Sequence, residues 1–371
     1  MGFSFGKEFR VTIFGESHGK VIGAVVDGCP AGLRLEERDI QCELERRRPG
    51  RGLVSGRGED DVVHILSGVS YGKTNGGPIL MLIHNKDLDS TWYERNRYIP
   101  RPGHADYTAF VKYGGHNDNR GGGFFSGRMT AGFVMAGSIA KKVLAKMGVR
   151  ILAHMIQING IKAREGLSDE EILENVAGSP VYCADRTASE LMVSEIRKLI
   201  EEGDSTGGVI ECRVSGLPVG LGEPIFDPVE GVLAHALFSI PGVKAVEFGS
   251  GFGLCSMRGS QSNDELYLQN GRVVTKTNHS GGVLGGITNG MPLIFRVGIK
   301  PTPSIKKRQR SVDLRTMEET EIEVVGRHDP CVAIRAVPVV ECVTAFCLLD
   351  LMIMAKMIPK VMGEEDGSKG S

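Results

Sequence analysis

The sequence lacks the features that mark several classes of protein. Its 371 residues carry a formal net charge of −1, without the basic excess of a general nucleic-acid binder. Residues 1–15 contain no apolar signal core, and the most apolar stretch, 337–359, is interrupted by Glu341, Asp350 and Lys356. We therefore expect a cytoplasmic chain that binds neither nucleic acid nor a membrane.

The eight cysteines also lack the spacing that a metal site or a redox motif requires. They form no CxxC pair and no Cys/His cluster, and the chain has no P-loop, GxSxG or HExxH motif. We expect reduced thiols and no bound metal.

Glycine, by contrast, is abundant. The chain has 51 glycines, about twice the usual share of about 7%. They show no Gly-X-Y period, and prolines number only 16, which excludes collagen-like and low-complexity chains. The glycines enrich long polar segments, where they let backbone N–H groups approach an anionic ligand. These segments are 50–61, 87–127, 249–264 and 276–290.

The periodicity of the chain predicts an α+β protein. Helical patterns cover 36–47, 130–146, 168–176, 186–202, 228–239 and 339–358. Strand-like patterns cover 9–14, 62–66, 79–84, 150–158, 208–215, 293–297 and 321–325. Because strands and helices do not alternate strictly, we expect antiparallel sheets packed on helices. We expect a single domain over 1–362 and a disordered tail over 363–371.

Two motifs lie in the first fifty residues. GESHG, residues 15–19, follows a predicted strand and presents His18, which could exchange a proton near neutral pH. The alternative is a plain surface turn. RRRPGR, residues 46–51, ends a predicted helix. Its guanidinium groups could bind phosphate or carboxylate, or could only complement the helix dipole on a solvated face.

The later motifs also contain residues that could exchange a proton or bind an anion. RPGHAD, residues 101–106, precedes a glycine turn, RGGG at 120–123, and SGRMT at 126–130, which opens a helix. Such a turn favours phosphate, although it could be simple capping. GRHDPC, residues 326–331, combines a cation, an imidazole and a carboxylate. NHSGGVLGG at 278–286 and KPTPSI at 300–305 precede it, and each motif alone is a weak signal.

Together these motifs resemble the chorismate synthase family. GESHG, RRRPG, RPGHAD, the GGG-to-SGR segment, SGGxxGG, KPTPSI and GRHDPC occur in the family's order over roughly 5–356. The resemblance implies a β-α-β sandwich, with antiparallel sheets flanking central helices and long Gly-rich active-site loops. It also implies a homotetramer.

The implied activity is that of a lyase. The family converts 5-enolpyruvylshikimate 3-phosphate to chorismate and phosphate by an anti-1,4-elimination, the last step of the shikimate pathway. The reaction requires reduced FMN (FMNH2) without net redox change. The substrate has two carboxylates and a phosphate, and FMN has another phosphate. Arg-rich and Gly-rich loops suit such ligands.

The motif matches imply roles for individual residues. His18 is similar to the histidine that protonates the departing phosphate, with Ser17 as a hydrogen-bond partner. His104 is similar to the histidine that protonates reduced flavin, provided that a neighbouring anion keeps its pKa up. Asp329 resembles the carboxylate near flavin N5, where the substrate C6 proton ends up. The substrate-binding guanidinium groups are those of Arg47, Arg48, Arg128 and Arg327.

The implied flavin contacts lie in three parts of the chain. They are Phe124, Phe125, Ser126, Gly285, Lys300, Pro301, Thr302, Pro303, Ser304 and again Arg327. Phe124-Phe125-Ser126-Gly127-Arg128 stands where many members have Arg-Ser-Ser-Ala-Arg, so one Arg contact is absent or replaced.

Two alternatives remain open. Some family members also reduce FMN with NADPH, but no separate Rossmann fingerprint occurs here, which favours a monofunctional enzyme served by a separate flavin reductase. The second alternative is a non-catalytic anion- or nucleotide-binding protein that kept the fold.

Overall fold

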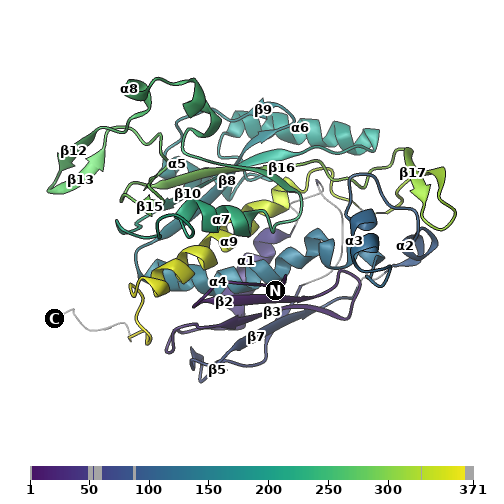
Figure 1. Cartoon of the computed structure of the whole chain (residues 1–371), viewed down its shortest axis with the longest axis horizontal. Helices are drawn as coiled ribbons and strands as arrows, with labels where there is room; N and C mark the ends of the chain where they lie inside the picture. The colour runs from purple at the N-terminus through teal and green to yellow at the C-terminus, as the bar shows by residue number, and fades with distance from the viewer. Residues whose placement is uncertain (1, 49–52, 54–60, 87–88, 327, 364–371) are drawn as a thin grey trace.

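Two antiparallel sheets enclose a layer of helices in the computed structural model (Figure 1). The structure describes all residues except 1, 49–52, 54–60, 87–88, 327 and 364–371. The first sheet has the strand order β1-β2-β3-β7-β4. Its strands are β1 (Ser4–Phe5), β2 (Arg10–Gly15), β3 (Val21–Asp27), β7 (Ile79–His84) and β4 (Val63–Ile65).

The second sheet has the strand order β11-β16-β10-β8-β9. Its strands are β11 (Val243–Phe248), β16 (Leu293–Ile299), β10 (Gly208–Ser215), β8 (Arg150–Ile158) and β9 (Ile161–Lys162). On β16, Leu293, Phe295, Val297 and Ile299 are buried while the residues between them are half-buried. This alternation is typical of a strand with one face on the core.

Four helices form the layer between the sheets, as Figure 1 shows. They are α1 (Glu37–Arg47), α4 (Thr130–Lys146), α7 (Val229–Leu237) and α9 (Ala333–Met354). Helix α4 packs on β2 and β3 of the first sheet, whereas α9 packs on β8 and β10 of the second, and the two helices pack on each other. The predicted α+β class, with antiparallel sheets flanking central helices, is therefore confirmed.

The remaining elements lie outside this three-layer core. The helices are α2 (Thr91–Arg95), α3 (Asp106–Lys112), α5 (Asp169–Val176), α6 (Arg186–Glu202) and α8 (Gly259–Ser262). The 3-10 turns are η1 (Arg120–Phe125), η2 (Gly127–Met129) and η3 (Gly251–Ser256). The hairpins are β5–β6 (Val69–Ser70, Lys73–Thr74), β12–β13 (Leu266–Gln269, Arg272–Thr275), β14–β15 (Val283–Leu284, Ile287–Thr288) and β17–β18 (Gln309–Asp313, Glu318–Ile322).

Helix α9 is the central element of the core. Within the described residues it is the one helix long and apolar enough to cross a membrane, but 89% of its apolar window is buried inside the protein. Its charged residue Glu341 is buried against Arg46 of α1, at 2.6 and 3.0 Å, and Lys141 of α4, at 2.8 Å. The helix is thus a core helix, as the interrupting charges indicated.

The sequence-based boundaries differ from the structure in several places; helix α9, for example, ends at Met354 rather than at residue 358. Helix α9 begins at Ala333 rather than at residue 339, because Pro338 is accommodated inside the helix although proline normally ends one. Strand β18 covers Glu318–Ile322 instead of 321–325. Strands β3 and β11 were not predicted. Three consecutive residues of β3 are buried, so it lacks a period-2 pattern.

Candidate active site

A cavity of about 640 Å³ lies where α1 ends and where α4 and α9 begin. This volume is typical of a small-molecule site. Most of the residues that the motifs singled out line it. They are Arg47, Arg48, His104, Phe124, Phe125, Ser126, Arg128, Lys300, Pro301, Thr302, Pro303, Ser304 and Asp329. The fold thus brings together segments from the start, the middle and the end of the chain.

Three predicted residues do not line the cavity in the described part of the chain. Ser17 and His18 are buried behind its wall, with His18 5% exposed. Gly285 is exposed in the turn of the β14–β15 hairpin. Arg327 lies outside the described residues, so its position is not assigned.

Two consecutive glycines of η1, Gly121 and Gly122, lie directly against the side chains of His18 and His104, where a larger residue would not fit. A Cβ at Gly121 would lie 2.3 Å from His18 Cδ2 and 2.7 Å from Ser17 Oγ, and one at Gly122 would lie 3.2 Å from His104 Nε2. Both glycines have left-handed φ values, +59° and +85°. Gly121 itself lines the cavity, so glycine keeps the wall between His18 and the cavity thin.

His18 is held in place on its other side as well. Its Nδ1 lies 2.9 Å from Ser90 Oγ, and the ring of Tyr93 meets the imidazole edge-on at 5.3 Å. The backbone N–H of Ser17 donates to Gly123 O at 3.1 Å. The GESHG turn and the RGGG turn therefore form one packed unit.

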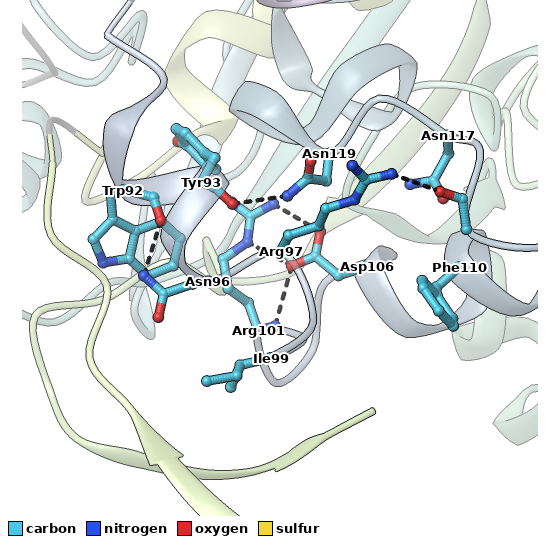
Figure 2. A pocket seen from close by; sticks show the side chains of 11 residues that line it. Trp92, Tyr93, Asn96, Arg97, Ile99, Arg101, Asp106, Phe110, Asn117 and Asn119 are labelled. Carbon is cyan, nitrogen blue, oxygen red and sulfur yellow. Dashed lines mark hydrogen bonds and ion pairs between the residues drawn. The ribbon is translucent and has the colours of Figure 1, made fainter. Parts of the chain in front are cut away.

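His104 and Asp106, both half-buried, form an ionic group with the buried Arg101. The Nδ1 atom of His104 lies 2.6 Å from Asp106 Oδ1, and Arg101 pairs with both oxygens of Asp106 at 2.7 and 2.8 Å. Figure 2 shows the Arg101–Asp106 pair beside a second cavity of about 20 Å³. Arg101 lines both cavities.

The titration of this group follows from its burial. Burial alone would raise the pKa of Asp106, but hydrogen bonds from Arg101 and His104 outweigh it and hold that pKa well below its usual range. Burial is also the largest influence on His104, and it lowers the pKa of the imidazole although the bond to Asp106 opposes it. The neighbouring anion that the proposed role requires is present, but burial outweighs it and lowers the pKa of His104.

A second ionic group at the cavity consists of Asp61, Arg128 and Arg47. Asp61 Oδ1 lies 2.9 Å from Arg128 Nη2, and Asp61 Oδ2 lies 4.0 Å from Arg47 Nη2. All three side chains are buried. Burial lowers the pKa of Arg47 to about 10, with Asp61 opposing the shift.

Asp329 is paired with a residue that the motifs did not identify. Arg335, in the first turn of α9, binds both of its oxygens at 2.6 and 3.1 Å. Arg335 lines the cavity too. Asp329 lies four residues before α9, so no helical spacing in the sequence indicated this pair.

The KPTPS segment is fastened to the RPGHAD segment. Lys300 Nζ donates to Gly103 O, and Arg101 Nη1 donates to Ser304 Oγ at 3.2 Å. Burial, followed by the nearby charge of Lys244, lowers the pKa of Lys300. Lys244 also lines the cavity and was not predicted.

The chain that forms this cavity is similar to known proteins over nearly its whole length. Residues 9–353 match the family model described as chorismate synthase. The chain belongs to the chorismate synthase family. A chorismate synthase from Dehalococcoides mccartyi strain BAV1 is 50% identical over 363 residues, covering 98% of this chain and 100% of the relative. One from Aeropyrum pernix is 51% identical over 356 residues, covering 96% and 94%.

A solved structure agrees with this assignment. The crystal structure of a chorismate synthase superposes with a TM-score of 0.75 at 31% identity, covering 94% of this chain and 93% of the other. Members of the chorismate synthase family are enzymes that catalyse the last step of the shikimate pathway. The resemblance inferred from the motifs is thereby confirmed.

Proposed function

We propose that the protein converts 5-enolpyruvylshikimate 3-phosphate to chorismate and phosphate in the 640 Å³ cavity, with reduced FMN bound beside the substrate. The observation that carries this proposal is the combination of Arg47, Arg48 and Arg128 with one carboxylate, Asp329, and one imidazole, His104. Guanidinium groups form bidentate hydrogen bonds with carboxylate and phosphate, which suits a substrate with three anionic groups.

The cavity also suits a flavin phosphate. The Oγ1 of Thr302 is buried without a hydrogen-bond partner, and Lys300 and Lys244 line the same wall. Phe124 and Phe125 lie against each other at 4.6 Å between ring centres and offer an apolar surface for a flat ring system. We assign flavin binding to these residues together with Ser126, Pro301, Pro303 and Ser304. Gly285 and Arg327 remain predictions from the motifs alone.

Reduced FMN supplies the reducing character that the elimination needs, without net redox change. The chain's own residues would move the protons. Asp329, oriented by Arg335, would accept the C6 proton of the substrate. The motif match assigns protonation of the departing phosphate to His18, with Ser17 beside it, across the thin wall that Gly121 forms in this structure. Arg128, which lines the cavity, would stabilise the charge on that phosphate. His104 would hold a proton at the flavin side of the cavity.

An anionic ligand also changes the titration of His104. Negative charge in the cavity favours the imidazolium form, so it would raise the pKa that burial lowers. His104 would then hold a proton more readily after ligands bind than before.

We further propose a monofunctional enzyme that receives reduced flavin from a separate reductase, and a cytoplasmic homotetramer. The alternative is a bifunctional form that also reduces FMN with NADPH. One domain over 1–362 accords with one large cluster of buried apolar side chains that extends from Phe9 to Met362, beside a small second cluster around Ile172.

The test is an anaerobic assay of phosphate release with prereduced FMN. We expect His18→Ala and His104→Ala to bind substrate but to lose turnover by about 10²-fold, the usual scale for a lost general acid. His235→Ala is the matched control, because His235 lies on α7 and does not line the cavity. Wild-type turnover by both site variants would contradict the assigned roles.

A second condition separates the two forms of the enzyme. Aerobic assay with NADPH and oxidised FMN, without added reductase, should give no chorismate. Product formation in that condition would favour the bifunctional form.

A further inference from the structure

We propose that Asn85 is a positioning residue that holds the His18 turn and the Arg128 guanidinium in one fixed arrangement. The inference rests on the proposed function, in which His18 and Arg128 serve the same departing phosphate. Asn85 directly follows β7 and does not itself line the cavity among the described residues. It therefore acts through its neighbours.

One half of the Asn85 amide fixes the turn. Its Nδ2 donates to Glu16 O at 3.0 Å and to Gly19 O at 2.8 Å, the two carbonyls that flank Ser17 and His18. The backbone N–H of Asn85 also donates to Lys20 O at 3.1 Å. These three bonds pin both ends of the turn to the end of β7.

The other half of the amide fixes the guanidinium. Asn85 Oδ1 accepts from Arg128 Nε at 2.7 Å, while Arg128 Nη2 lies 2.9 Å from Asp61 on another edge. The backbone N–H of Arg128 donates to Ser126 Oγ at 3.3 Å, at the start of η2. Arg128 is thus oriented by both Asp61 and Asn85, and Asn85 also binds the turn that contains His18.

Only an amide of this length satisfies all of these partners. The turn requires two N–H donors, because both groups are carbonyl oxygens, whereas Arg128 Nε requires an acceptor. A carboxylate would serve Arg128 and repel the carbonyls. An alanine would serve neither. The two substitutions therefore separate the two halves of the proposed role.

The experiment measures kcat by anaerobic phosphate release and substrate affinity by titration calorimetry. In Asn85→Asp we expect substrate affinity within about threefold of wild type, because the acceptor for Arg128 remains, but kcat lower by about 10²-fold, the scale of a small misplacement of a reacting group. In Asn85→Ala we expect the same fall in kcat and about tenfold weaker binding, as for one lost hydrogen bond to a charged group.

Asn175→Ala is the matched control. Asn175 Oδ1 accepts from Arg186 at 3.2 and 3.0 Å, the same pairing of side chains far from the cavity. We expect its kcat and affinity within about twofold of wild type. Because Asn85→Ala removes three contacts and can impair folding, the isosteric Asn85→Asp decides the question.

Wild-type kcat in Asn85→Asp would overturn the proposal, as would equal substrate affinity in the Asp and Ala variants. If the wild-type protein itself releases no phosphate, the proposed function fails. The role of Asn85 in orienting Arg128 is then decided by the affinities alone.

Discussion

The carboxylate of Asp61 stands between two buried guanidinium groups, Arg47 and Arg128. Two like charges held close together in a dry site repel each other, and each loses its hydration. An anion between them offsets both costs. Asp61 thereby stabilises the two buried cations that, in the proposed function, bind the anionic substrate.

The prediction at this scale concerns Asp61→Asn, which keeps the shape of the side chain and removes its charge. We expect the free energy of unfolding to fall by about 3 kcal/mol, the scale of breaking a buried ion pair. We also expect inorganic phosphate to raise the Tm of the variant more than that of the wild type, because an added anion replaces the lost one. Thermal and urea unfolding, with and without phosphate, measure both effects.

Asp27→Asn provides the control for Asp61. Asp27 pairs with Arg10 in an exposed position, with 39% of its side chain accessible. Exposed pairs of this kind contribute at most about 1 kcal/mol. Equal losses of stability in the two variants would contradict the special role of Asp61.

At the scale of elements, Glu341 ties three helices together. It lies on α9, pairs with Arg46 of α1 and Lys141 of α4, and accepts from the backbone N–H of Ala153 on β8 at 3.1 Å. Burial would raise the pKa of Glu341, but Lys141 and Arg46 outweigh it and lower the pKa to about 2. The helix layer therefore depends on an ionised carboxylate.

This gives a prediction for pH dependence. The folded-state pKa, about 2, lies below the ordinary value of 4.5, so the unfolded chain takes up the proton first. The contribution is complete above about pH 4.5 and is lost as the pH falls towards 2. We expect Glu341→Gln to be less stable than wild type by about 3 kcal/mol at neutral pH.

Urea unfolding at a series of pH values measures the difference between the two proteins. It should shrink steadily between pH 4.5 and pH 2. A difference that stays constant over that range would show that Glu341 is not ionised in the folded protein.

The whole molecule decides which thiols can react. Cys42 and Cys255 are exposed, and the other six cysteines are buried, all eight as free thiols. Burial raises the pKa of Cys29 and of Cys331 to about 12, so their reactive thiolate forms are scarce. The reactivity of each cysteine thiol therefore indicates whether that residue is packed in the core.

We expect a thiol reagent to modify two cysteines rapidly in the native protein and all eight after denaturation. Mass spectrometry of the labelled protein, with and without denaturant, gives both counts. A reducing agent should not alter them. Fewer than eight modified thiols in denaturant would reveal a disulfide, and rapid labelling of Cys342 or Cys347 would show that α9 is not packed as described.

Most of the motif residues line one cavity, whereas several boundaries of helices and strands differ from the predicted ones. Motifs such as RPGHAD and KPTPSI are local, so their residues could be named directly. Asp61, Lys244 and Asn85 escaped notice because their roles depend on partners distant in the chain. Arg128, for example, pairs with Asn85, which lies 43 positions before it. Arg335 escaped notice because neither a motif nor a helical spacing links it to Asp329.

The sequence by itself determined the family and the antiparallel α+β class, since these depend on residue types and short spacings. Tertiary structure alone decided that Ser17 and His18 lie behind Gly121 and that Gly285 lies away from the cavity. It also decided that His104 loses rather than gains basicity. The reason is physical: exposure and desolvation depend on what the rest of the chain packs against a residue, which short motifs do not contain.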